Sequence, residues 1–160
     1  MNKVLILLTC LLSFSLLAVD YKWEKNAEDS AKLEKSVAVA AREFNFVIRK
    51  VASSRLRKAT APYKTLTLTI EGDNVTFIRD GKDPLKAVIG GEPVLWLESK
   101  VSFQRLPEGK LKQIFAAEDG TREFIYTFNA DKSLAVSVKL TSDKLKKPME
   151  YTLKYVPVQK

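Results

Sequence analysis

The residue types that most often carry catalysis or bind metals are nearly absent from this chain. It has no histidine and one cysteine, Cys10. Ser-His-Asp and Cys-His catalysis and haem bound by an imidazole all need a histidine, and zinc sites of the Cys/His type need several such ligands. The six glycines form neither a phosphate-binding loop nor a dinucleotide-binding fingerprint. We therefore expect no enzyme activity, no cofactor and no metal site.

Carboxylates are the remaining groups that could act as a general acid and a general base. Seven of the 19 lie in segments that we predict to be turns: Glu71, Asp73, Asp80, Asp83, Glu118, Asp119 and Asp131. Aspartate favours turns because its side chain forms hydrogen bonds with nearby backbone. We interpret these carboxylates as solvated turn residues.

Two polar side chains stand where a strand would otherwise carry apolar residues. Arg105 follows Val101 and Phe103 at a spacing of two. Gln113 holds a similar place two residues before Phe115. Side chains two positions apart in a strand point to the same face, so both would face the interior. An unpaired buried charge is costly, so Arg105 must pair with an internal acid, reach solvent at a barrel mouth or meet an anionic ligand.

Aromatic residues share faces of the same predicted strands. In a barrel of about eight strands they would either line a pocket or fill a solid core, since such a barrel is just wide enough for one small ligand. The residues that we expect to line a ligand cavity are Trp96, Phe103, Arg105, Gln113, Phe115, Tyr126, Phe128, Tyr151 and Tyr155.

The segment between Glu43 and Glu71 is strongly basic, with six Lys or Arg residues and no acid. Beside the apolar Phe44, Phe46 and Ile48, these cations suit a surface that binds anionic lipid, lipopolysaccharide or an acidic partner. Cations near a helix end also complement the helix dipole, so a solvated helix end accounts for the same charges. The residues expected at such a surface are Arg49, Lys50, Arg55, Arg57 and Lys58.

The elements that position these residues follow from the spacing of apolar side chains. From Asp29 to Lys58, apolar residues recur every three or four positions, which predicts an amphipathic helix. Asn26 and Asp29 stand where the N-terminal cap belongs, and Pro62 ends the segment. The apolar stripe requires a surface to cover, so we expect the helix to pack on the domain that follows.

From Lys64 onward the apolar period changes to two. Leu66, Leu68 and Ile70 alternate with threonines, and the same alternation recurs as far as Tyr155. Short clusters rich in Gly, Asp, Asn and Pro separate the runs. The fold class is therefore mainly β: an antiparallel up-and-down meander of eight or nine strands behind the helix. A meander of this size closes into a barrel or folds into two packed sheets, because open edges invite aggregation.

The strand rhythm over residues 63–157 resembles that of lipocalin-like barrels of the calycin superfamily, as found in small secreted bacterial proteins. The segments that carry the resemblance are 71–76, 80–82, 118–120, 124–130, 131–140 and 151–156. The Gly-x-Trp motif that opens many lipocalins is absent from the first strand, and Trp96 lies in the middle of the barrel. The resemblance implies a cavity for an apolar small molecule. It also suggests that Arg105, with a hydroxyl of Tyr126 or Tyr155, holds a ligand carboxylate, as an interior arginine often does in fatty-acid-binding barrels.

Residues 1–18 have the anatomy of a cleavable signal peptide. Lys3 supplies the positive start, residues 4–17 are almost wholly apolar, and Ala18 is a small residue at the cleavage point. Cleavage would remove Lys3 and Cys10 and lower the net charge from +8 to +7. The mature chain would begin near Val19 or Asp20.

Two alternatives for this segment remain open. Leu7-Leu8-Thr9-Cys10 can act as a lipidation box, or the segment can stay uncleaved as an anchor. The apolar run is shorter than the roughly 20 residues that a membrane-spanning helix needs. We expect cleavage and a periplasmic or secreted protein.

We thus expect three parts: the signal peptide (1–18), a helical segment (19–62) and an antiparallel β-barrel domain (63–160). The predicted function is that of an exported, non-enzymatic, monomeric binding protein for a small hydrophobic or amphipathic ligand. An anionic membrane surface is a further expected partner, and nucleic acid is not. The alternative is an envelope-surface or protein-interaction module whose barrel is filled and which binds through its basic N-terminal helix.

Overall fold

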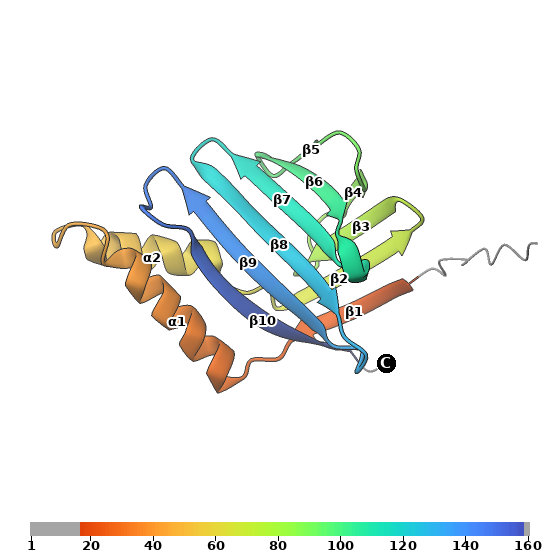
Figure 1. Ribbon diagram of the computed structural model, residues 1–160, viewed down its shortest axis with the longest axis horizontal. Coiled ribbons are helices and arrows are strands. Elements are labelled where there is room, and N and C mark those ends of the chain that lie inside the picture. The colour runs from red at the N-terminus through yellow and green to blue at the C-terminus, as the bar shows by residue number, and fades with distance from the viewer. Residues whose placement is uncertain (1–16, 159–160) are drawn as a thin grey trace, which may run out of the picture.

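The computed structural model describes residues 17–158 and shows a nearly closed antiparallel barrel with two helices at one end (Figure 1). The expectations for residues 1–16, including the lipidation of Cys10, lie outside the described residues. The point of cleavage expected after Ala18 lies within the first strand, β1 (Leu17–Trp23).

Ten strands form one sheet in the order β4-β3-β2-β1-β10-β9-β8-β7-β6-β5, where eight or nine were expected. A parallel bridge from Ile89, just after β4 at one edge of the sheet, reaches Phe103 in β6, the strand next to the other edge. The bounds after β1 are β2 (Thr65–Glu71), β3 (Asn74–Arg79), β4 (Leu85–Val88), β5 (Val94–Trp96), β6 (Ser99–Arg105), a 3-10 turn η1 (Pro107–Gly109), β7 (Leu111–Ala117), β8 (Gly120–Phe128), β9 (Leu134–Ser142) and β10 (Met149–Pro157).

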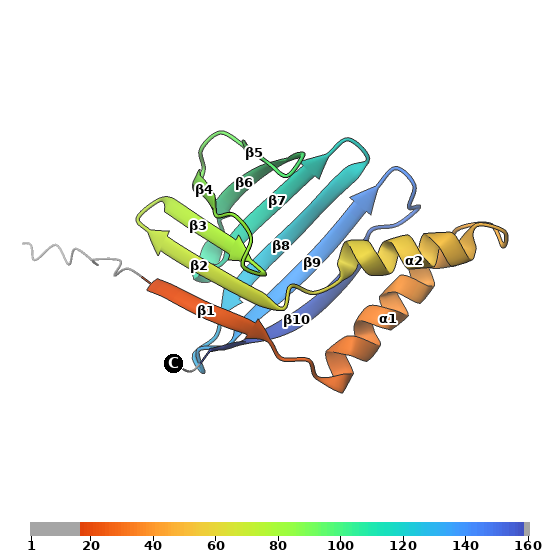
Figure 2. The ribbon, with the colours of Figure 1, turned by 180° about the vertical axis from the view of Figure 1, so that it is seen from behind.

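Strand β1 stands where sequence analysis predicted only helical structure. It pairs with β2 on one side and β10 on the other, so it lies in the middle of the sheet (Figure 2). The sequence carries a short period-two signal here, because Val19, Tyr21 and Trp23 alternate with polar residues. Tyr21 is buried in the core.

Two helices replace the single predicted helix: α1 (Ala27–Ala41) and α2 (Arg49–Thr60). Of the two predicted cap residues, Asn26 caps α1, since its side chain accepts a hydrogen bond from the Asp29 backbone N–H at 2.7 Å. The chain turns at residues 42–48, and Asn45 accepts from the Ile48 N–H at 3.1 Å just before α2 begins. A straight helix of 30 residues would be about 45 Å long and would run past the barrel. The turn brings the second half back over the barrel end instead.

Alternate residues of the strands fill the barrel, as their period of two predicted. Phe77, Val101, Phe103 and Leu134 are fully buried. Helix α1 lies outside the barrel against β10, and α2 runs from the tip of the helical pair back to the barrel end.

Candidate functional site

A cavity of about 850 Å³ lies at one end of the barrel, beneath α2. The β5–β6 turn, the β7–β8 turn and the loop between β9 and β10 form its other walls. Most of its lining is apolar and comes from Phe44, Ile48, Val51, Leu56, Trp96, Phe115, Leu140 and Leu145.

Aromatic rings form the floor of this cavity. Trp96 and Phe115 lie with ring centroids 6.1 Å apart, and Phe115 meets Phe124 edge to face at 5.5 Å. Beneath this floor the side chains leave a residual space of only about 10 Å³, which is about the minimum that a single water requires. The barrel is thus packed in its middle and hollow at the helix-covered end.

Arg79, at the end of β3, lines the cavity with its guanidinium group between two rings. Its Cζ lies 4.7 Å from the Trp96 ring centroid and 5.0 Å from that of Tyr63. Nη1 donates a hydrogen bond to the Tyr63 hydroxyl at 2.9 Å, whereas the buried Nε has no partner. Stacking on aromatic faces stabilises the cation without neutralising it.

Arg122, in β8, is the second arginine of the cavity wall. Its Nε is buried and has no hydrogen-bond partner. Within residues 17–158, neither Arg122 nor Arg79 forms an ion pair with a carboxylate. A half-buried guanidinium is costly to leave without a counter-charge, so the two arginines favour the binding of an anion.

The mouth of the cavity adds positive charge. Exposed Arg55 of α2 and Lys144 of the β9–β10 loop both line it. Lys144 lies 3.5 Å from the Asp119 carboxylate, which is the one acid among the lining residues. Four cations and one carboxylate therefore give the site a positive balance.

The structure divides the predicted ligand residues between this cavity and the core. Trp96 and Phe115 line the cavity. Phe103, Gln113 and Tyr126 are buried below it, where the Tyr126 hydroxyl donates to the Gln113 Oε1 at 2.5 Å. Burial raises the pKa of Tyr126 well above its ordinary value.

The remaining predicted aromatics hold the barrel and the helices together. Tyr151 and Tyr155 donate hydrogen bonds to the carbonyl oxygens of Thr60 and Tyr63, at 3.3 and 3.1 Å, and so fix the connection between α2 and β2. Burial raises the pKa of both tyrosines. Phe128 packs against the core at the far end of β8.

Arg105 is not brought to this cavity. It lies at the opposite end of β6, with a side chain that is 44% exposed, and donates hydrogen bonds to the Gly72 carbonyl and, at 3.2 Å, to the Asp73 carboxylate. Of the three outcomes expected for Arg105, the structure shows a solvent-exposed position at a barrel end. Strand β6 ends at Arg105, two residues after Phe103. The Arg105 side chain is on the inward face, but at the strand end no further strand residues cover it.

The predicted basic surface is dispersed over the turns of α2. Arg57 forms a bidentate pair with Glu34 of α1, with a shortest distance of 2.9 Å. Arg55 faces the cavity mouth, and Lys58 is exposed farther along the helix. Arg49 and Lys50 lie at the start of α2, next to the turn from α1.

Arg79 and Arg122 were not predicted as site residues, although the spacing of two that placed Arg105 toward the interior applies to them as well. Arg79 follows the buried Val75 and Phe77 at a spacing of two. Arg122 likewise precedes Phe124 by two residues. The alternation of side chains alone cannot show that Arg79 and Arg122 are better candidates than Arg105, because only the tertiary structure shows which barrel end is hollow.

The sequence matches no protein-family model, and no curated protein is significantly similar to it. Among residues 17–158, no helix is both long and apolar enough to cross a membrane. No cluster of three or more potential metal-ligating side chains occurs in the same range.

Proposed function

We propose that this chain is an exported, non-enzymatic binding protein for a small amphipathic molecule with an anionic head group. One observation carries the proposal: an apolar cavity of about 850 Å³ contains two arginines, Arg79 and Arg122, that have no carboxylate partner among the described residues. Cavities of roughly 300–1,000 Å³ are typical of small-molecule sites.

The two kinds of lining suit the two parts of such a ligand. Phe44, Ile48 and Val51 offer apolar contacts on the helical side of the cavity. Arg79 and Arg122 supply positive charge from the barrel side. A carboxylate or phosphate bound there would provide the missing counter-charge, and hydrogen bonds to a charged group contribute about 1.5–3 kcal/mol.

The proposed lipocalin-like character is compatible with the nearly closed antiparallel barrel, which places a cavity at one end. Export is proposed from the signal-peptide anatomy of residues 1–18. A non-enzymatic role is proposed because the chain has no histidine and its cavity lining contains a single carboxylate, Asp119.

The test compares a fatty acid with its methyl ester, which lacks the charge. Arg122→Gln is expected to weaken binding of the acid by about ten- to a hundredfold, since one charge-assisted hydrogen bond is lost. Binding of the ester is expected to change little. Titration calorimetry or displacement of a fluorescent fatty acid would measure both affinities.

Arg105→Gln is the matched control, because it removes an arginine from the opposite end of the barrel. It is expected to leave the affinity for both probes unchanged. Absence of binding by the wild-type chain, or an equal loss for acid and ester in Arg122→Gln, would refute the head-group role. A loss of fatty-acid affinity that occurs only in Arg105→Gln would place the ligand site at the opposite end of the barrel.

A further inference from the structure

Four apolar side chains project from the connection between α1 and α2 and from the first turn of α2. Phe46 and Val47 are 85% and 83% exposed, and Ile48 and Val51 are about half exposed. We call these four residues the apolar tip. An exposed phenylalanine next to three exposed aliphatic side chains is unusual on a monomeric surface and marks an interaction site.

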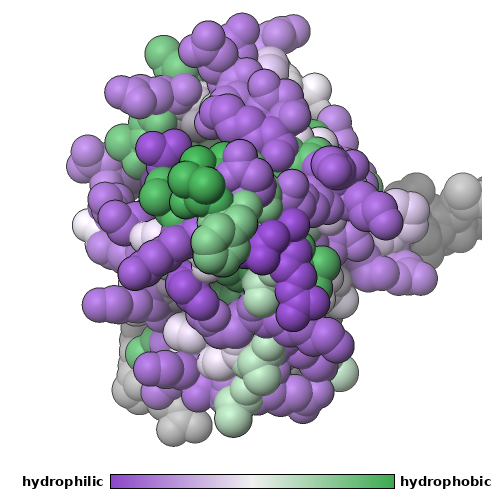
Figure 3. Space-filling view, turned by 90° about the vertical axis from the view of Figure 1, so that its left-hand side faces the viewer, coloured by the Kyte–Doolittle hydropathy of each residue, from purple (hydrophilic) through white to green (hydrophobic). Residues whose placement is uncertain are grey.

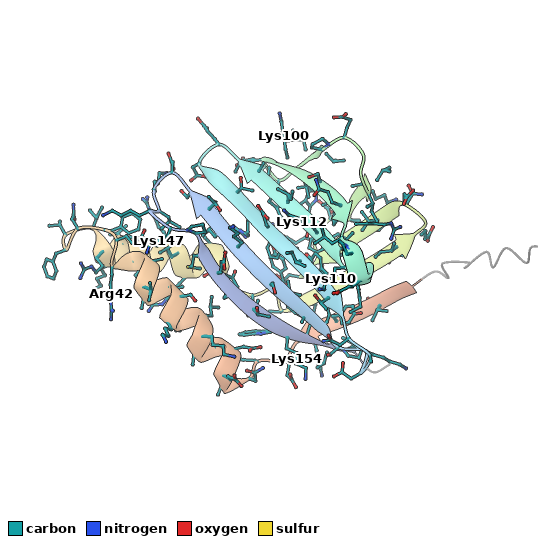
Figure 4. All side chains as sticks on the ribbon, viewed as in Figure 1. Arg42, Lys100, Lys110, Lys112, Lys147 and Lys154 are labelled. Carbon is teal, nitrogen blue, oxygen red and sulfur yellow. The ribbon has the colours of Figure 1, made fainter. Side chains whose placement is uncertain are left out.

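Cations surround the apolar tip. Residues 42–51 contain Arg42, Arg49 and Lys50 against one carboxylate, Glu43, which accepts a hydrogen bond from the Lys146 backbone N–H at 2.7 Å. The neighbouring loop, residues 143–147, adds three lysines and one aspartate. Figure 4 places Arg42 and Lys147 at this same end of the molecule, and Figure 3, which faces it, shows a hydrophobic patch framed by hydrophilic side chains.

The apolar tip is continuous with the cavity. Ile48 and Val51 belong to both, since they line the cavity wall as well as the exposed patch. Phe46 and Val47 lie outside the cavity lining. The chain thus presents its most exposed apolar residues beside the entrance to its ligand site.

We propose that the apolar tip docks on an anionic lipid bilayer. Apolar side chains enter the boundary between head groups and acyl chains, while the surrounding cations meet lipid phosphates. A second copy of this chain is a poorer occupant, because a two-fold contact would bring the cations of both tips together. Docking is independent of the proposed ligand; transfer of that ligand between cavity and bilayer rests on the proposed function.

Vesicle flotation tests the docking. Vesicles of phosphatidylcholine alone are compared with vesicles that also contain phosphatidylglycerol, at low and at physiological salt. Phe46→Ser/Val47→Ser is expected to lower binding to the anionic vesicles by about tenfold or more, because two apolar side chains no longer leave water. Arg49→Gln/Lys50→Gln is expected to lower it by about tenfold, with a weaker salt dependence.

Two matched controls replace the same kinds of side chain at positions away from the apolar tip. Leu95→Ser removes an apolar side chain that is 74% exposed on β5, and Lys110→Gln/Lys132→Gln removes two cations from the other barrel end. Both are expected to bind vesicles like the wild type. All variants carry the same residues 1–18, so they differ from the wild type only at the substituted positions.

Unchanged flotation of the tip variants, or an equal loss in the controls, would overturn the docking proposal. A concentration-dependent dimer that Phe46→Ser/Val47→Ser abolishes would also overturn it, in favour of a second copy. The tip variants are expected to keep fatty-acid affinity in solution, since neither residue lines the cavity. That measurement separates a failure of docking from a failure of the proposed ligand site.

Discussion

At the scale of single residues, the interior holds a polar pair where an apolar pair would fit. Gln113 is fully buried, and its Oε1 accepts the hydrogen bond of the Tyr126 hydroxyl while its Nε2 has no partner among the described residues. A buried polar group that loses its partner costs about 1–3 kcal/mol, whereas replacing both partners with apolar groups can be nearly neutral. Each member of the pair is therefore needed mainly because the other is present.

This dependence predicts strong coupling between the two positions. Tyr126→Phe and Gln113→Leu are each expected to lower the free energy of unfolding by about 1–3 kcal/mol. The double variant is expected to lose clearly less than the sum of the two. Urea denaturation of all four proteins measures the coupling, and strictly additive losses would show that the hydrogen bond does not link them.

At the scale of elements, a two-residue turn joins β5 to β6 at the cavity mouth. Leu97 and Glu98 both have positive φ, 46° and 66°. A two-residue hairpin turn with positive φ at both positions favours Asn and Gly, because side chains crowd the backbone in this conformation. The sequence gives no turn signal of that kind here, and the strand pairing imposes the conformation instead.

Glu98→Gly is accordingly expected to stabilise the protein by about 1 kcal/mol. Glu98 is exposed and does not line the cavity, so ligand affinity should stay unchanged. Glu92→Gly is the matched control, because Glu92 is also an exposed loop residue but is not among the residues with positive φ. It is expected to destabilise slightly, through the greater freedom of glycine in the unfolded chain. Thermal unfolding measures both effects. A lower melting temperature for Glu98→Gly would show that the positive φ at residue 98 does not strain the folded chain.

At the scale of the whole molecule, the two helices are tied to the barrel by tyrosines in β10. Tyr151 and Tyr155 anchor the segment after α2, and with Tyr21 and Tyr126 they form a set of four tyrosines whose pKa values are raised by burial. The folded state therefore binds these phenolic protons more tightly than the unfolded state does. The attachment of the helices to the barrel and the alkaline stability of the protein thus depend in part on the same side chains.

Stability should fall as the pH rises above about 10, where tyrosines of the unfolded chain ionise and those of the folded chain do not. Each such tyrosine contributes a slope of about 1.4 kcal/mol per pH unit. Tyr151→Phe/Tyr155→Phe is expected to reduce this slope by about half. Urea denaturation at about pH 8 and about pH 11 gives the measurement. An identical pH dependence in the variant would mean that other groups, such as lysines, govern alkaline unfolding.

The sequence alone determined the local features of this protein. A period of two predicted the antiparallel strands and which of their side chains fill the barrel, and Asn26 and Asp29 marked the start of α1 to within three residues. These features depend on neighbouring residues only. For the same reason the alternation of Val19, Tyr21 and Trp23 was available as a signal for β1, but it is short and adjoins an apolar segment that masks it.

Only the tertiary structure decided where the cavity lies and which cations reach it. Arg79, Arg105 and Arg122 obey the same inward parity, yet α2 covers the end that holds Arg79 and Arg122 and leaves Arg105 at the other end. The turn between α1 and α2 is what places the apolar tip beside that cavity. Such juxtapositions join segments that are far apart in the chain, so no periodicity within one segment can specify them.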